Sequence, residues 1–150
     1  MDLVIPLRAP HPGDGGRHLH PGLVPWRAAV CASTDPCLLL DAATRIVAAS
    51  PTAGRLLALE YNVDSIMPRF LDSGLSFLDF TAAADPLTES ELGRLAPVQA
   101  LQTDALERGL IRLDLGRVHR TFDVAASPLH SPPQLDAIGA LVFLNPVGPE

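Results

Sequence analysis

The segment PCLLLDAATRIVAASPTAGRLLAL, residues 36–59, decides the fold of this chain. An apolar run ends at Asp41, a polar turn follows, and a second apolar run ends at Ser50. Short apolar runs bounded by turn residues predict strands, here over 38–41 and 46–49. Ser50 is a favoured helix cap, and the proline after it is a favoured first helical residue. The segment therefore predicts a strand, a turn, a second strand and a helix.

A second helix signal lies further along the chain. Thr88 and Glu91 are spaced as a capping box, in which each side chain accepts a hydrogen bond from the other residue's backbone N–H. We expect this helix to run to about Arg108, with Gly109 as the residue that ends it. Pro97 lies inside the segment, where a proline kinks or breaks a helix.

Apolar patterns predict strands in the C-terminal part of the chain. Apolar and polar residues alternate over 111–115 and 118–124, and the segment 137–144 is almost wholly apolar. Together with the first two strands, these predict an α+β fold with a five-stranded antiparallel sheet and helices packed on one of its faces.

Residues 1–24 differ in composition from the rest of the chain. Prolines and glycines recur at short intervals without periodicity, which predicts a flexible arm. The histidines of the arm invite a metal interpretation, but we favour a solvated tail and expect no metal site, because a closed zinc site takes about four ligands. Residues 25–147 are predicted to form a single domain that opens with a short helix at 25–31.

Composition narrows the classes of function. The net charge of −6 and the lack of lysine disfavour direct binding to nucleic acid. Two cysteines make no disulfide framework, which favours a reducing cytoplasm. The N-terminus does not resemble a secretory signal, and no apolar run approaches the roughly 20 residues of a membrane span, so we expect no membrane association. A composition rich in Ala, Leu, Pro and Arg without lysine indicates a GC-rich bacterial genome.

Three segments of the chain are informative together: LLLDAATRIVAASPTAGRLL, residues 38–57, RTFDVAASPL, residues 120–129, and AIGALVFLNPV, residues 137–147. The first is similar to the opening strand pair and first helix of the PAS family, and the other two are similar to its closing strands. The resemblance covers about residues 33–147 and implies a standalone sensory module of bacterial type. The chain departs from the family in its first turn, which lacks the usual glycine, and at Ser50, where asparagine is common.

The resemblance also bears on cofactors. Haem-binding PAS domains usually ligate iron through a histidine on the long helix, and this chain has no histidine between His20 and His119. Flavin photosensors of the family need a cysteine in an Asn-Cys-Arg-Phe motif, which is absent; Cys31 and Cys37 lie before and within the first strand. We therefore predict no cofactor and disfavour both haem and flavin.

No catalytic group is predicted. His119 and Asp123 share one face of a strand, but residues four apart along a strand are separated by roughly 13 Å and cannot form a dyad. Ser127 lacks the glycines that surround a nucleophilic serine in a strand-to-helix turn. We therefore do not expect an enzyme.

The predicted inner face of the sheet supplies candidates for a ligand cavity. These candidates are Phe80, Leu101, Leu113, Arg120, Phe122, Val124 and Val142. Arg120 shares a face with apolar residues, where its guanidinium could clamp a ligand carboxylate. The alternative, which we favour, is that Arg120 lies near the start of its strand and its head reaches water.

Both faces of the last strand are apolar, which points to an interface. A sheet covered by helices on one side leaves its other face exposed, and an exposed apolar patch usually marks a contact surface. We expect self-association as a two-fold homodimer through Trp26, Val30, Leu141 and Phe143. The alternative is that the helix at 25–31 folds back and covers its own sheet.

These observations predict a sensory or regulatory module that binds a small molecule or a regulatory protein partner and signals through association. The chain carries no helix-turn-helix, kinase, cyclase or phosphatase motif of its own. Two alternatives stay open. One is a small-molecule-binding or catalytic accessory protein of a biosynthetic pathway that reuses the same cavity, and the other is a structural dimerisation domain with a filled core.

Overall fold

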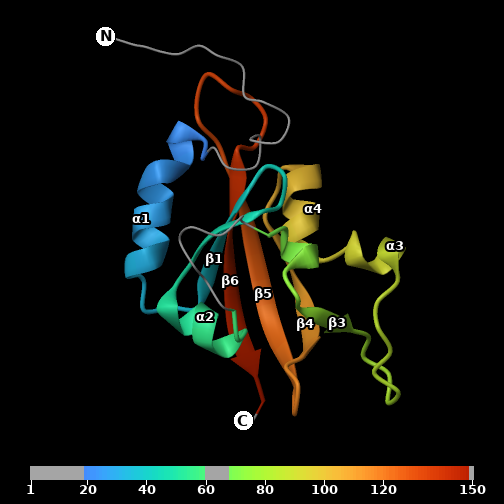
Figure 1. Cartoon of the computed structure of the whole chain (residues 1–150). Coiled ribbons are helices and arrows are strands. Elements are labelled where there is room, and N and C mark those ends of the chain that lie inside the picture. Colours follow the sequence, from blue (N-terminus) through green and yellow to red (C-terminus); the bar gives the residue numbers. More distant parts are fainter. Residues whose placement is uncertain (1–18, 60–67, 149–150) are drawn as a thin grey trace.

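An antiparallel sheet of six strands, in the order β2-β1-β6-β5-β4-β3, forms the centre of the molecule (Figure 1). The computed structural model describes residues 19–59 and 68–148. This order places an early strand, β1, beside the last strand, β6, and the α+β class is confirmed. The strands are β1 Cys37–Asp41, β2 Ile46–Ala49, β3 Ser76–Leu78, β4 Glu107–Asp114, β5 His119–Leu129 and β6 Gly139–Val147.

The strand that was not expected is β3. It pairs with β4 at one edge of the sheet, with Phe77 opposite Leu113. Its three residues are too few to show an alternation of apolar and polar side chains, so the sequence pattern does not distinguish it from a loop. The prediction of five strands is therefore wrong, because the sheet also includes this short edge strand.

Helices flank the sheet, as Figure 1 shows. Within residues 19–59 and 68–148, no helix has the length and apolar character needed to cross a membrane. The helical elements are η1 Pro21–Leu23, α1 Val24–Ala32, α2 Pro51–Leu56, η2 Phe70–Asp72, α3 Glu89–Leu92 and α4 Ala96–Thr103.

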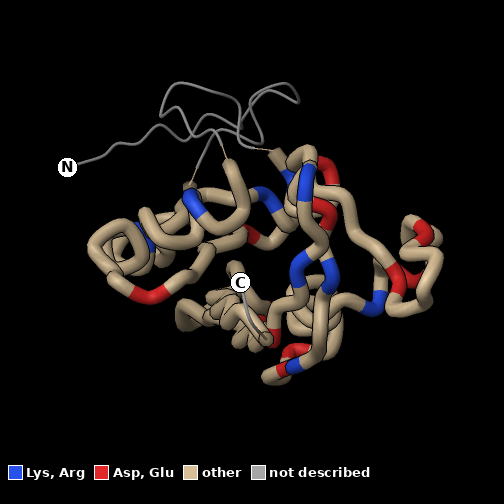
Figure 2. Tube along the Cα trace, turned by 90° about the horizontal axis from the view of Figure 1, so that it is seen from below, with Lys and Arg blue, Asp and Glu red and all other residues tan. Residues whose placement is uncertain are grey.

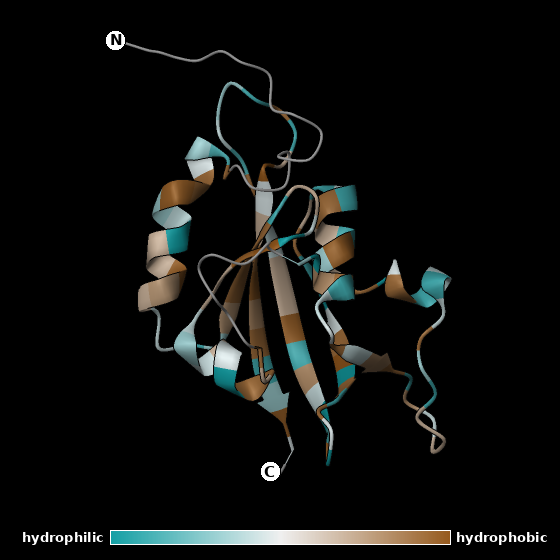
Figure 3. Cartoon of the chain, viewed as in Figure 1, coloured by the Kyte–Doolittle hydropathy of each residue, from teal (hydrophilic) through white to brown (hydrophobic). Residues whose placement is uncertain are grey.

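Two apolar clusters lie on opposite faces of the sheet, and in Figure 3 brown, apolar segments mark the central strands, α1 and α4. We call them the inner and the outer cluster. The helix α1 packs on the outer cluster, so the prediction that all helices lie on one face of the sheet is wrong for α1. The inner cluster is Leu38, Leu40, Ile46, Ala53, Leu57, Phe70, Phe77, Leu95, Ala96, Ala100, Ile111, Leu113, Phe122, Val124, Ala126, Val142 and Leu144. The outer cluster is Leu23, Val30, Cys37, Leu39, Val47, Ala48, Leu129 and Ile138.

The turn between β1 and β2 forms without glycine. The Asp41 carboxylate oxygen Oδ1 accepts hydrogen bonds from the backbone N–H groups of Ala43 and Arg45, each at 2.9 Å. Thr44 takes the left-handed conformation, with φ of +66°, that a glycine often adopts in such turns. The aspartate side chain thus closes the turn, and the departure from the usual glycine leaves the hairpin intact.

Ser50 joins β1 to α2. Its hydroxyl oxygen accepts a hydrogen bond from the Ala53 N–H at 3.2 Å, as an N-cap does, and another from the Cys37 N–H at 3.0 Å. Ser50 is fully buried, so both N–H groups would lack an acceptor without it. The predicted cap is confirmed.

The predicted helix from Thr88 to Arg108 is divided. The capping box of Thr88 and Glu91 is present, but α3 ends at Leu92 and α4 begins at Ala96. Pro97 lies in the first turn of α4, where its missing N–H costs nothing. The residue after α4, Asp104, has a left-handed φ of +55°, so the helix ends there, and the expected C-terminal Gly109 lies in β4 instead.

The domain begins earlier than the predicted residue 25. Leu23 is fully buried in the outer cluster. The His20 side chain caps η1, because its Nδ1 accepts a hydrogen bond from the Gly22 N–H at 2.9 Å. Residues 19–24 therefore belong to the folded domain and not to an arm. Residues 1–18, which make up the rest of the predicted arm, lie outside the described residues.

A close backbone contact at Gly139 yields a stability prediction. A Cβ atom at this position would lie 2.3 Å from the Leu40 carbonyl oxygen, and backbone of a paired strand cannot move aside freely. We expect Gly139→Ala to lower the free energy of unfolding by roughly 1–3 kcal/mol, measured by urea denaturation.

Gly54 in α2 is the matched control, because a Cβ there would meet nothing within 4 Å. Gly54→Ala should raise stability by about 0.5–1 kcal/mol, since alanine is the better helix former. Equal denaturation midpoints for the two variants would contradict this account of Gly139.

Candidate functional site

The central strands present apolar side chains to both faces of the sheet. On β1 and β6, Leu38 lies opposite Val142 and both belong to the inner cluster. One residue further along, Leu39 lies opposite Leu141, and this pair lies on the outer face. Each face is therefore a candidate for contact with a ligand or a partner.

The inner face is packed at the positions predicted to line a cavity. Leu113, Phe122, Val124 and Val142 meet in the inner cluster, and each exposes 1% or less of its surface. A side chain beside a space large enough for water keeps accessible area there. These four side chains therefore pack directly against neighbouring atoms, and at these positions the predicted cavity wall is filled core.

Two other predicted cavity residues lie elsewhere. Leu101 on α4 is half-buried and does not belong to the inner cluster, so its assignment to the cavity wall is not supported. Phe80 is 57% exposed, so its assignment to the cavity is wrong. The aromatic core position is filled instead by Phe70 and Phe77, whose ring centroids lie 5.2 Å apart.

The loop that carries Phe80 is held outside the core by its own hydrogen bonds. Asp79 Oδ1 accepts hydrogen bonds from the N–H and hydroxyl of Thr81 and from the Asp85 N–H. The hydrogen bond from the Thr81 hydroxyl is the main cause that lowers the pKa of Asp79. Arg112 donates to the carbonyl oxygens of Asp79 and Thr81 at 3.2 and 3.0 Å. These hydrogen bonds fix the conformation of the loop, and in this conformation the Phe80 side chain is exposed.

The structure also changes the predicted interface. Val30 is only 2% exposed, because α1 packs on the outer cluster, and its assignment to an interface is wrong. The alternative, that the helix covers its own sheet, is confirmed for β1 and β2, on which α1 packs. Trp26 and Phe143 are 38% and 37% exposed and stay candidates, and Leu141 is half-buried.

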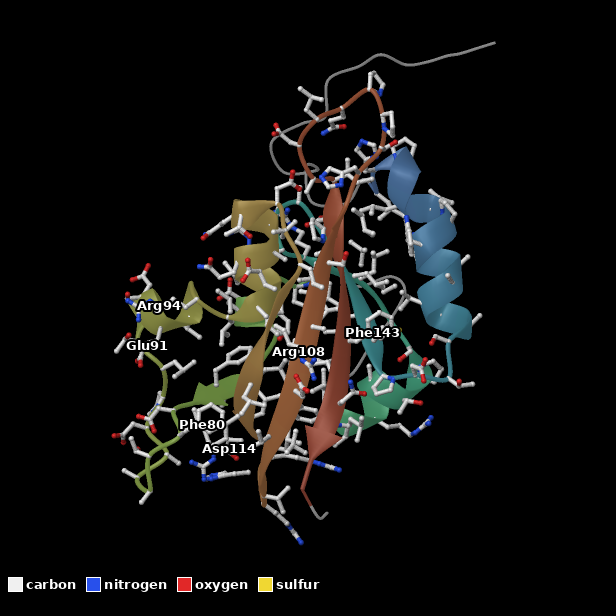
Figure 4. All side chains as sticks on the ribbon, turned by 180° about the vertical axis from the view of Figure 1, so that it is seen from behind. Phe80, Glu91, Arg94, Arg108, Asp114 and Phe143 are labelled. Atoms are coloured by element: carbon white, nitrogen blue, oxygen red, sulfur yellow. The ribbon has the colours of Figure 1, made fainter. Side chains whose placement is uncertain are left out.

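Sequence reasoning missed two further exposed residues on the outer face. Leu110 and Val147 are 53% and 46% exposed. Alternation in β4 and β6 could have placed them opposite the core face. With the neighbours Ala125 and Phe143, which pair across β5 and β6, and with Leu141, they form what we call the outer patch. Figure 4 shows this face, with Phe143 and Arg108 on the sheet and α1 to one side.

An ion pair crosses the sheet within the outer patch, because Arg108 lies opposite Ala125 and Asp123 lies opposite Leu110. Arg108 on β4 donates from Nε and Nη2 to both carboxylate oxygens of Asp123 on β5, at 3.0 and 2.5 Å. This two-pronged bond lowers the pKa of Asp123 and raises that of Arg108. Both carboxylate oxygens of Asp123 therefore accept hydrogen bonds from Arg108. In the view of Figure 2, basic and acidic residues are interspersed along the chain.

Solved structures similar to this chain share one fold. The PAS domain of a protein from Colwellia psychrerythraea matches with a TM-score of 0.54 and 14% identity, over 83% of this chain and 97% of that chain. The PAS domain of nitrogen regulation protein NR(II) from Vibrio parahaemolyticus matches at 0.51 and 20%, over 83% and 98%. This chain has the PAS fold. The LOV protein of Rhodobacter sphaeroides matches at 0.55 and 19%, over 81% and 64%.

Sequence comparison adds no assignment to this PAS fold, since no family model and no curated protein matches the chain. At 14–20% identity, the structural likeness establishes the fold alone.

Arg120 lies at the margin of the inner cluster of this PAS fold. It is the second residue of β5 and is partly exposed, with its guanidinium carbon 6.0 Å from the Phe122 ring centroid. That distance allows a cation–π contact with a fully buried ring. Whether the guanidinium clamps a ligand or reaches water stays a prediction.

The described histidines and cysteines lie away from the inner cluster. His119 and His130 are exposed, and His20 caps η1. Cys31 is exposed, and Cys37 is buried in the outer cluster. The absence of haem and flavin stays a prediction.

The Arg108–Asp123 pair predicts a pH effect. We expect Asp123 to titrate below its ordinary pKa of 3.8, because Arg108 stabilises the carboxylate in the folded protein. A lowered pKa stabilises the fold above the unfolded-state pKa, and this contribution is lost as the pH falls through the folded-state value. Carboxyl titration by NMR measures it directly.

Arg108→Gln should raise the pKa of Asp123 toward the ordinary value. Arg27→Gln, which removes an exposed arginine from α1, should leave it unchanged. An identical Asp123 titration in wild type and Arg108→Gln would refute the assigned cause.

Proposed function

We propose that this chain is a regulatory association module that works through the outer face of its sheet, where it meets a second copy of itself. The observation that carries this proposal is the contrast between the two faces. The inner face is packed at the predicted cavity positions, whereas the outer patch exposes Leu110, Phe143 and Val147 around a single ion pair. Exposed apolar groups of this kind are buried favourably by a partner.

The occupant that fits this face is a copy of the same chain. A two-fold axis places a surface against itself, so the surface has to complement its own charges. Arg108 and Asp123 supply one charge of each sign within the outer patch, which allows the face to meet a copy without an excess of like charge. Trp26 lies exposed on α1, the helix that packs on the same side of the sheet, and would extend the contact.

A regulatory role is supported by the way the sheet connects its two faces. Neighbouring residues of β1 and β6 contribute alternately to the inner cluster and to the outer face. A change in packing on one face therefore shifts strands that also form the other face. One similar structure is a PAS domain of a nitrogen regulation protein, in keeping with this proposal. We place the module in the cytoplasm and assign it no catalytic step.

Of the two alternatives, the packed inner cluster favours a structural dimerisation domain over a protein that binds a small molecule in its core. A structural dimerisation domain needs no ligand cavity, whereas a sensor or a pathway accessory that binds a small molecule in the core must displace side chains such as Phe122, which is fully buried. Native mass spectrometry of freshly purified protein separates these cases. A retained small molecule favours a sensor or accessory protein, and its absence favours structural dimerisation.

Sedimentation equilibrium tests the association itself. We expect a dimer at micromolar concentration, and we expect Phe143→Ser to weaken it at least about tenfold, because buried aromatic side chains dominate interface energies. Trp26→Ala should weaken it as well.

Leu135 provides the matched control, since it is 88% exposed and lies outside the outer patch. Leu135→Ser removes a comparable apolar side chain and should leave the association constant unchanged. A wild-type monomer across the micromolar range, or equal losses in Phe143→Ser and Leu135→Ser, would overturn the proposed interface.

A further inference from the structure

Two arginines face each other at the edge of the sheet beyond β2. Arg45, just before β2, and Arg69 form an antiparallel bridge. Backbone hydrogen bonds of 2.8 Å flank the bridge, one from the Ile46 N–H to the Pro68 carbonyl and one from the Phe70 N–H to the carbonyl just before Arg45. This pattern makes the arginines a non-hydrogen-bonded pair, the closest cross-strand arrangement, with Cα atoms about 4.5 Å apart.

Both arginine side chains leave the backbone on the same face. Their neighbours Ile46 and Phe70 are buried in the inner cluster. Side chains alternate along extended backbone, so Arg45 and Arg69 lie on the opposite face from that cluster. Arg45 is partly exposed and Arg69 is exposed, which leaves both guanidinium groups accessible to a dissolved ion.

No described residue neutralises this pair through a hydrogen bond or ion pair to either guanidinium. Asp41, the nearest acid on β1, directs Oδ1 to the backbone N–H groups of its own turn. Asp72 follows Arg69 closely but forms only a backbone bond to it, from its N–H to the Arg69 carbonyl at 2.9 Å. Like charges directly opposite each other destabilise a strand pair. Among the described residues nothing offsets the repulsion between the two guanidinium groups, and an anion bound between them would remove it.

We propose that Arg45 and Arg69 form a binding site for an oxyanion, namely a phosphate group or a carboxylate. A guanidinium is planar and presents paired N–H donors that match the edges of both groups. Two such forks on one face bind separate edges of the same anion, which gains charge-assisted hydrogen bonds and removes the repulsion. This site lies apart from the outer patch and does not depend on the proposed association.

An anion titration followed by NMR tests the site. Inorganic phosphate is added at constant ionic strength to wild type, Arg45→Gln and Arg69→Gln, with acetate as a parallel series. We expect saturating shifts of the backbone amides around Arg45 and Arg69 in wild type, with an apparent Kd at least about tenfold weaker in each variant. Arg27→Gln is the control, and its response should equal that of wild type. Saturation by phosphate alone or by acetate alone identifies the source of the oxyanion.

A melting experiment tests the repulsion without relying on the titration. In phosphate-free buffer at low salt, Arg69→Gln should melt at a higher temperature than wild type, and added sodium chloride should reduce the difference by screening. Amide shifts that do not saturate with either anion, shifts that are equal in wild type and Arg69→Gln, or a lower melting temperature of Arg69→Gln in phosphate-free buffer would overturn the proposal.

Discussion

The pairing of β1 with β6 is the constraint on which the rest of the structure depends. The first four residues of β1 are all buried, because this apolar strand has no polar side to present to water. β6 meets it over five positions, from Cys37 opposite Phe143 to Asp41 opposite Gly139. A strand pair that is apolar on both sides must be covered on both sides. This requirement places α2 and α4 on one face and draws α1 onto the other.

Sequence patterns predicted the features that depend on residues close along the chain. They failed where contacts between distant segments decide whether a side chain is buried. Ser50 and Thr88 cap helices as expected, because a cap needs only the next few backbone N–H groups. Leu23 and Val30 were assigned to an arm and an interface, since nothing in their own segment shows that it packs on a distant sheet. Phe80 was assigned to the core on its apolar character, whereas hydrogen bonds within its loop hold it outside.

The candidate site, like the fold, could be predicted only in part from the sequence. Alternation along β5 and β6 brought Phe122, Val124 and Val142 together correctly, but alternation cannot tell a cavity wall from a filled core, because both are apolar. The distinction comes from side-chain volume across the whole cluster. The exposed outer patch follows from the same alternation once α1 is known to cover β1 and β2. The proposed contact surface therefore lies on the outer face of the sheet and not on its inner face.

The central claim, that the inner cluster is filled around Leu113, Phe122, Val124 and Val142, is tested most directly by xenon binding. Apolar cavities bind xenon, and methyl NMR shifts report where it binds. We expect no saturating shift at the methyl groups of Leu113, Val124 and Val142 in wild type. Phe122→Ala, which opens a cavity beside them, should show one. A saturating shift at these methyl groups in wild type would contradict the claim and restore the inner face as a ligand site.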